Sequence, residues 1–317
     1  MRWLQENRLA AIALATLVVL NVILIALLFR PRTPPSADPY IPPTQPEPTT
    51  TAPEPVPSTT TTAPEDEPTT AAPVEPVPAL RLLTIASVEI GWRATVGDCE
   101  TPGLVEFSGD GGQTWATTDP GLAPVVRLKA LAETTAFAIG GAEDCEPSFT
   151  ITASAGAEWE SQDNELPGAW YLEPADRNAV HGPGGTAAPC TTQVVDVAGL
   201  TNTQAAVLCT DGAVHLTGDA GATWAAAGNL AGGVALAPQL SSNADNLGYL
   251  FASLEEGCDG VAVRFVTEDV AGLTDTAACV PVPDAQPGAV ALALNEDVAW
   301  LWAGEQVLVS ADAGTTW

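Results

Sequence analysis

Carboxylates are the most abundant side chains in this sequence that could do chemistry. The 317-residue chain has 39 Asp and Glu against 10 Lys and Arg, a formal net charge of −29. Hydrolysis of a glycosidic bond needs two carboxyl groups about 5–9 Å apart. In so acidic a chain, solvated loop charge is the favoured interpretation of any neighbouring pair, so no catalytic residue is assigned. Three acidic groups in predicted turns leave the alternative open: Asp98/Glu100, Glu143/Asp144 and Glu255/Glu256/Asp259.

Other reactive side chains give weaker signals. Ser154 lies in Ala-Ser-Ala-Gly, but a nucleophile elbow needs a strand before the serine and a helix after it, and no helix is predicted there. There is no Cys-x-x-Cys, and the two histidines, His181 and His215, are far apart in the sequence, so a zinc site is not indicated. We therefore expect no metal and no cofactor.

Two neighbouring aromatic residues are the candidate binding residues. Trp170 and Tyr171 lie in a segment, 169–181, with the pattern of an extra hairpin. An exposed aromatic pair on a loop can stack on a sugar ring or anchor a protein partner. Packing of the hairpin itself is the alternative, structural interpretation.

An eight-residue phrase, Ser/Thr-x-Asp-x-Gly-x-Thr-Trp, recurs along the chain and points to the elements that position these residues. Each copy follows an alternating apolar run and is rich in turn residues, which indicates a strand, a turn and a second strand. The Asp can accept hydrogen bonds from its own turn, and the Gly permits a positive φ. The Trp is predicted to bury its ring beneath the hairpin. Five copies, two of them degenerate, supply the structural residues Ser108, Asp110, Gly112 and Trp115; Gly156 and Trp159; Thr217, Asp219, Gly221 and Trp224; Asp269; and Ser310, Asp312, Gly314 and Trp317.

This phrase resembles the Asp-box, or BNR, repeat of sialidases, sortilin-type receptors, xyloglucan-degrading enzymes and photosystem II assembly factors. The resemblance covers residues 79–317 and implies a β-propeller in which each box joins the third and fourth strands of a blade, away from any active site. Sialidase activity would require an arginine cluster, a Tyr nucleophile and a Phe/Tyr-Arg-Ile-Pro phrase. That phrase is absent, and this region has just five arginines, with Tyr171 and Tyr249 as its tyrosines.

The spacing of the boxes predicts the number of blades. Three strands can be traced before each box, for example Val125–Leu131 as the first strand of the second repeat. The step from Ser154 to Asp219 is longer than the others and has room for half of a degenerate blade at 169–181. The sequence therefore predicts an all-β propeller of five to seven blades, with six favoured. A short last strand, or a segment near Pro78–Leu83, is expected to close the ring.

The cysteines indicate an oxidising compartment. Their number is even, and all six lie in the predicted propeller. Cys99 and Cys145 occupy equivalent turns, between the second and third strands of neighbouring repeats, which favours that pair. Six cysteines allow 15 pairings, so the connectivity stays open. The remaining candidates would then pair locally: Cys190 with Cys209, and Cys258 with Cys279.

The N-terminal segments predict a membrane anchor and a stalk. Residues 9–29 are 21 uncharged, largely apolar residues, long enough for one transmembrane helix and longer than the apolar core of a typical signal peptide. Residues 1–8 are then cytoplasmic. Residues 30–78 are rich in Pro, Thr and Glu and are expected to be an extended, disordered stalk, with or without O-glycosylation. The propeller is expected on the extracytoplasmic side of the cell membrane.

These observations favour a non-enzymatic role. The strong negative charge excludes nucleic acid as a partner. We expect a binding or assembly platform for proteins at the cell surface. A binder of cell-wall or extracellular glycans is the alternative, and a glycoside hydrolase is less favoured.

Overall fold

The computed structural model describes residues 75–239, 247–273, 275 and 277–317. The expected cytoplasmic segment and membrane span, and nearly all of the stalk, lie outside these residues. Within the described part of the chain, no helix is both long enough and apolar enough to cross a membrane.

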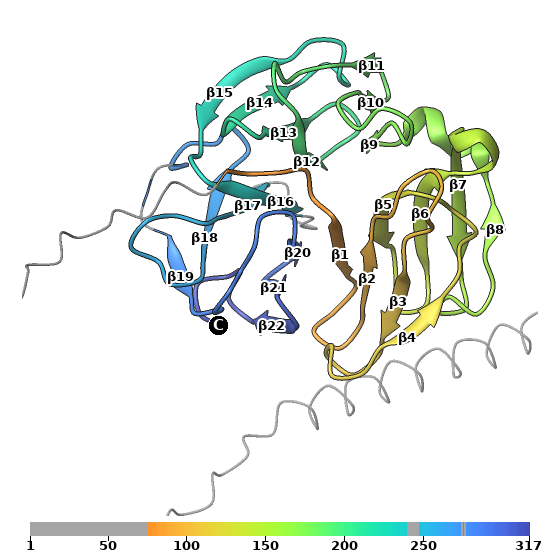
Figure 1. Ribbon diagram of the computed structural model, residues 1–317, viewed down its shortest axis with the longest axis horizontal. Coiled ribbons are helices and arrows are strands. Elements are labelled where there is room, and N and C mark those ends of the chain that lie inside the picture. Colours follow the sequence, from red (N-terminus) through yellow and green to blue (C-terminus); the bar gives the residue numbers. More distant parts are fainter. Residues whose placement is uncertain (1–74, 240–246, 274, 276) are drawn as a thin grey trace, which may run out of the picture. The chain divides into compact units, whose positions relative to one another are not determined.

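Six antiparallel sheets follow one another along the chain and form the blades of a β-propeller (Figure 1). This confirms the predicted fold and the favoured number of blades. The first blade contains β1 (Arg81–Ile85), β2 (Gly91–Thr95), β3 (Val105–Ser108) and β4 (Ala116–Thr118). The second contains β5 (Val125–Ala130), β6 (Ala136–Gly141), β7 (Pro147–Thr152) and β8 (Glu160–Ser161), with short 3₁₀ helices η1 (Glu143–Cys145) and η2 (Asp163–Gly168).

The third blade is small and forms where the extra hairpin was expected. It contains β9 (Tyr171–Leu172), β10 (Val180–Gly182) and β11 (Gly185–Ala187). The fourth blade contains β12 (Val194–Gly199), β13 (Ala205–Cys209), β14 (Ala213–Thr217) and β15 (Ala225–Asn229). The fifth contains β16 (Gly233–Gln239), β17 (Gly248–Ser253), β18 (Val261–Thr267) and β19 (Ala278–Val280), and the sixth β20 (Val290–Asn295), β21 (Val298–Ala303) and β22 (Gln306–Ser310).

The sixth blade meets the first directly. Its inner strand β20 packs beside β1, and its sheet has three strands among the residues that the structure describes. The segment near Pro78–Leu83, one of the two expected ways of closing the ring, runs into the first blade and adds no strand to the sixth sheet. Arg81–Ile85 is the inner strand of the first blade, because Arg81 to Ile85 pair in register with Thr95 to Gly91 of β2.

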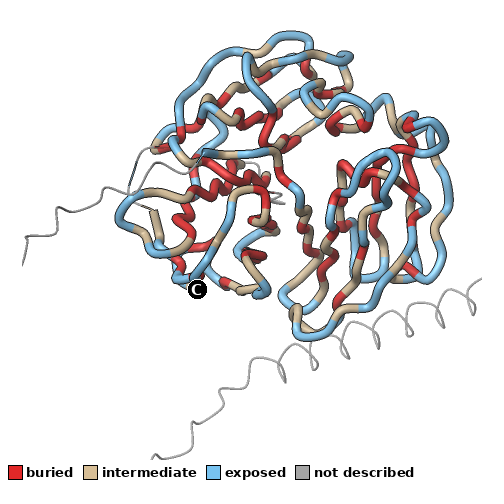
Figure 2. The backbone as a smooth tube through the Cα atoms, in the orientation of Figure 1, coloured by how far each residue is buried: buried red, intermediate tan, exposed pale blue. Residues whose placement is uncertain are grey.

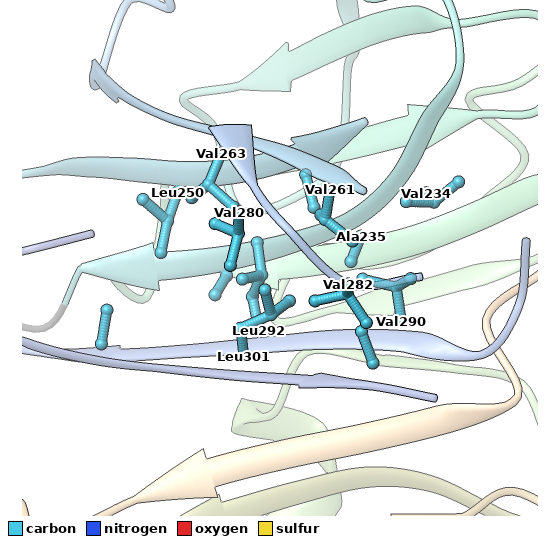
Figure 3. Close-up of a cluster of buried hydrophobic side chains, with 14 of the residues drawn as sticks. Val234, Ala235, Leu250, Val261, Val263, Val280, Val282, Val290, Leu292 and Leu301 are labelled. Carbon is cyan, nitrogen blue, oxygen red and sulfur yellow. The ribbon is translucent and has the colours of Figure 1, made fainter. Parts of the chain in front are cut away.

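The core lies between the blades. Strand β17 is buried along its whole length because both faces of its sheet are covered by neighbouring sheets (Figure 2). Figure 3 shows one such interface, where Leu250 and Val263 of the fifth blade meet Leu292 and Leu301 of the sixth. Burying an aliphatic side chain of this size contributes about 1.5–3 kcal/mol to the stability of the fold. Contacts between blades therefore supply most of the stabilisation that a single blade would not have.

The Asp boxes form the hydrogen bonds expected of them. Asp219 Oδ1 accepts from the backbone N–H of Thr223 at 2.9 Å, and its Oδ2 accepts from the Thr223 hydroxyl at 2.6 Å. Thr217 Oγ1 donates to Asp219 and accepts from the N–H of Gly221 at 3.1 Å. In the box that lacks Asp, Ser154 Oγ accepts from the N–H of Glu158 at 3.0 Å. Ser154 therefore has a structural role in its turn.

Each box glycine also faces the preceding blade. A Cβ added to Gly156, whose φ is +85°, would lie 2.3 Å from Thr118 Cγ2 of the first blade. Gly221 likewise faces Trp170 of the third blade. The box tryptophans are half-buried and point the same way. Trp115 packs edge-on against Trp300 of the sixth blade, with 6.3 Å between the ring centroids, so the box fastens one blade to the one before it.

Three disulfides join the pairs that their positions favoured. Cys99 and Cys145 link the first two blades, with 5.4 Å between their Cα atoms. Cys190–Cys209 ties the start of the fourth blade to its second strand, and Cys258–Cys279 lies within the fifth blade.

Candidate binding groove at the third blade

The short inner strand of the third blade leaves a hollow beside it. Strand β9 has two residues, whereas β5 and β12 on either side have six each (Figure 1). The second blade therefore lacks a full sheet to pack against, and a groove of about 480 Å³ opens between the second, third and fourth blades.

Two cations lie at the floor of this groove. Arg127 and Lys129 are two positions apart on β5, so their side chains leave the same face of the sheet. Arg127 Nη1 donates to the carbonyl of Val197 across the gap, at 3.4 Å. Lys129 Nζ has no hydrogen-bond or ion-pair partner in the described part of the chain. Burial, and secondarily the charge of Arg127, lower the pKa of Lys129 to about 8.

The walls of the groove combine aromatic and aliphatic side chains with the polar residues Gln162, Glu165, Thr201 and Asn202. On one side Phe137 and Phe149 of the second blade stack with 4.7 Å between their ring centroids. Leu131, 51% exposed, stands at the mouth of the groove on the same blade. On the opposite side lie Trp170 of the third blade and Leu200 of the fourth. The groove thus combines two cations with a mixed lining of aromatic, aliphatic and polar side chains, as small-molecule sites can.

Behind the floor, the inner strands surround a central cavity of about 60 Å³ that also contacts Arg127 and Lys129. Among its described lining residues Asp196 is the one carboxylate, so this cavity does not supply the acidic pair that glycoside hydrolysis needs. The two oxygens of Asp196 accept from the N–H groups of Val197 at 2.8 Å and Leu236 at 3.1 Å. Burial raises the pKa of Asp196 to about 6, opposed by these amides and by Arg127 and Arg177.

Arg177 approaches the same carboxylate from the third blade. Its Nη2 donates to the carbonyl of Ala79 at 2.6 Å, where the chain enters the propeller. Its Nε is buried and has no hydrogen-bond partner. Two guanidinium groups, Arg127 and Arg177, therefore act on one carboxylate that is already hydrogen-bonded at both oxygens.

The aromatic residues chosen from the sequence are placed differently from the expectation. Trp170 is 7% exposed and Tyr171 is 3% exposed, so they do not form an exposed pair. Trp170 Nε1 donates to the carbonyl of Thr201 at 2.8 Å, and Tyr171 stacks on His181 with 4.5 Å between ring centroids. The packing interpretation of the hairpin is the right one, although one side of Trp170 still lines the groove.

The acidic groups chosen from the sequence are dispersed. Asp98 lies in the exposed turn after β2, where the N–H groups of Glu100 and Thr101 lower its pKa. Glu255 is bound to Arg264 and lines, with Glu256, a separate pocket between the fourth and fifth blades. None of these acids reaches the groove.

Sequence reasoning missed Arg127 and Lys129, although a signal was present. The described residues include just six Lys and Arg beside 31 acids, and two of the six alternate within one predicted inner strand. None of the six is exposed in the structure. Arg81, for example, lies over the ring of Trp302, and Arg93 pairs with Glu106 at 2.7 Å. The outer surface therefore carries acidic charge without exposed Lys or Arg over the described residues.

Comparison with known proteins gives matches to structures alone. No family model matches the chain, and no curated protein does. A structure of YCF48 bound to D1 peptide is 17% identical, with 78% of this chain and 82% of that chain covered and a TM-score of 0.27. A lectin from Aleuria aurantia in complex with a fucosylated sugar is 11% identical, with 77% and 99% covered and a TM-score of 0.43. The sialidase of Trypanosoma rangeli is 10% identical, with 73% and 53% covered and a TM-score of 0.43.

These neighbours include two classes that the repeated phrase resembles, a photosystem II assembly factor and a sialidase. The chain spans about half the length of the sialidase. The chain itself folds as a six-bladed propeller built on Asp boxes.

Proposed function

We propose that this protein is a non-enzymatic binding platform, anchored in the cell membrane by residues 9–29 and displaying its propeller on the extracytoplasmic side. The apolar N-terminal run, the Pro/Thr/Glu-rich stalk and the three disulfides support this arrangement. The partner bound is a protein of the cell surface or envelope.

The groove at the third blade is the observation that carries the proposal. It is concave, has aromatic and aliphatic side chains in its walls, and presents a cation, Lys129, with no partner among the described residues. A half-buried ammonium without a counter-charge weakens the fold, because desolvation costs free energy that no ion pair offsets. A bound partner that supplies the counter-charge would restore that free energy.

The proposal is tested by crosslinking in living cells of the source organism. Full-length tagged wild type, Lys129→Met and Lys129→Arg are compared, and crosslinked proteins are identified by mass spectrometry. We expect one set of partners with the wild type and with Lys129→Arg, which keeps the charge, and loss of that set with Lys129→Met. Equal recovery with all three variants, or recovery of no protein above an untagged control, would contradict the proposal.

A further inference from the structure

We infer that the groove at the third blade is a site for a single carboxylate attached to an aromatic or branched aliphatic body, with the carboxylate at Arg127 and Lys129. This inference deepens the proposed function, on which it rests, by naming the chemical group that the partner or ligand presents.

The charge balance at the floor favours an anion. Arg127 and Arg177 act on one carboxylate nearby, Asp196, whose two oxygens already accept backbone N–H groups. Lys129 lines the groove beside Arg127 and has no acidic partner in the described residues. Hydrogen bonds in which a group is ionised are about twice as strong as neutral ones, so an incoming anion gains most at the unpaired ammonium of Lys129.

The surroundings favour one negative charge over several. The described residues carry 31 acids and no exposed Lys or Arg, so the field outside the groove repels anions. Glu165, on η2, adds an exposed carboxylate at the rim. A phosphate monoester carries nearly two negative charges at neutral pH, so the acidic surface repels it about twice as strongly as it repels a carboxylate. A carboxylate carries one charge, and its two oxygens can accept from two neighbouring cations.

The walls favour an apolar body. The stacked rings of Phe137 and Phe149 face Trp170 and Leu200 across the groove, and Ile151, which pairs in register with Phe137, lines it too. These side chains offer aromatic faces and methyl groups to an apolar body, while Gln162, Thr201 and Asn202 add polar groups to the same groove. A volume of about 480 Å³ is in the lower part of the usual range for small-molecule pockets, roughly 300–1,000 Å³.

The test measures binding to purified full-length protein in lipid nanodiscs by isothermal titration calorimetry. The probes are 3-phenylpropionate, its neutral analogue 3-phenylpropanol, and the dianion benzylphosphonate. We expect 3-phenylpropionate to bind about ten- to hundredfold more tightly than the alcohol, and more tightly than the phosphonate. Lys129→Met should lose that preference and Lys129→Arg should keep it. Equal affinity for acid and alcohol, or unchanged preference in Lys129→Met, would overturn the inference.

A second measurement covers the case in which Lys129→Met fails to fold. In the wild type, the affinity for 3-phenylpropionate should fall as pH rises through about 8, where Lys129 loses its proton, while that for the alcohol stays level. Arg127 and Arg177 stay charged over this range, and Asp196 is already ionised above pH 7. A flat profile for the acid between pH 7 and pH 9 would count against the site.

The source of the carboxylate is resolved by two peptides, acetyl-Ala-Ala-Phe with a free C-terminus and the same peptide amidated. Tighter binding of the free acid than of 3-phenylpropionate indicates a polypeptide chain end, and weaker binding indicates a small metabolite. Failure here is separable from failure of the proposed function. Partners captured in cells in a Lys129-dependent manner, together with no preference for acid over alcohol, would leave the platform standing and remove the carboxylate.

Discussion

Replacing Gly156 by alanine tests whether the boxes hold neighbouring blades together. The residue has φ of +85°, and an added Cβ would lie 2.3 Å from Cγ2 and 2.8 Å from Cβ of Thr118 in the first blade. Thr118 is β-branched and lies in strand β4, so its methyl group cannot move aside without moving the strand. Gly156→Ala therefore combines two costs, a left-handed backbone and a clash between blades.

Two other glycines separate these costs. Gly121 has φ of +72° with nothing within 4 Å of an added Cβ, and Gly168 has open space and no positive φ. A left-handed backbone costs an alanine about 1–2 kcal/mol, and overpacking costs about 1–3 kcal/mol. We expect the free energy of unfolding to fall by about 1–2 kcal/mol in Gly121→Ala and by about 2–5 kcal/mol in Gly156→Ala. Gly168→Ala should be neutral or stabilising by up to about 1 kcal/mol.

The assay is urea denaturation of the full-length protein in nanodiscs, followed by tryptophan fluorescence, with the three variants and the wild type measured side by side. If Gly156→Ala and Gly121→Ala lose the same free energy within error, the box glycine is not seated on the preceding blade. The description of the boxes as fasteners between blades would then be wrong.

Three further predictions follow from the disulfides and the carboxylates. The disulfide Cys99–Cys145 closes a loop of 46 residues, and replacing both cysteines by serine should lower the free energy of unfolding by about 4 kcal/mol in the same denaturation assay. The disulfide Cys258–Cys279 closes a loop of 21 residues, so its removal should cost less. A smaller loss for Cys99–Cys145 than for Cys258–Cys279 would contradict the loop-closure reasoning. Hydrogen bonds from Thr114 and Thr316 lower the pKa of Asp110 and Asp312 to about 2. The stabilisation that these two carboxylates give the fold is therefore complete above the unfolded pKa near 4 and is lost as pH falls toward 2. Acid unfolding of Asp312→Asn, monitored by circular dichroism, should occur at higher pH than in the wild type. The pKa of Asp196 is raised to about 6, so ionisation of this carboxyl group lowers the free energy of unfolding as pH rises from about 4 through 6. In Asp196→Asn, the free energy of unfolding should change less with pH in that window. An unchanged slope of free energy against pH would show that this carboxylate does not titrate there.

The repeated phrase made most of the fold predictable. The strand predicted over Val125–Leu131 is β5, Val125–Ala130, so its start is right and its end is one residue off. The outer strands were less visible, because Glu160–Ser161 is too short to show a period. The strands of the third blade have two or three residues, too few to show an alternating pattern. The main sign of this blade was the long stretch of sequence between the boxes at Ser154 and Asp219.

The candidate site was harder to predict because the groove forms where the inner strand of the third blade is short. Alternation shows that Arg127 and Lys129 share a face, but it does not show that the sheet opposite them is short. Trp170 was misjudged for a related reason. Its ring fits against Gly182, Gly199 and Gly221, three glycines from different parts of the chain, and sequence spacing does not show that they surround one ring.

The direction in which the boxes face sets an order of assembly. Gly156, Gly221 and Gly314 each face the blade made before their own, so a new blade can be secured as soon as its box is complete. The first box is the exception, since Gly112 faces Val307 and Trp300 of the last blade. During synthesis this first box has no blade to pack against until the last blade arrives. The contact between the first and last blades is therefore the last to form. A chain that ends before the last blade leaves Trp115 uncovered, and chaperones and proteases can distinguish such a chain from the complete propeller.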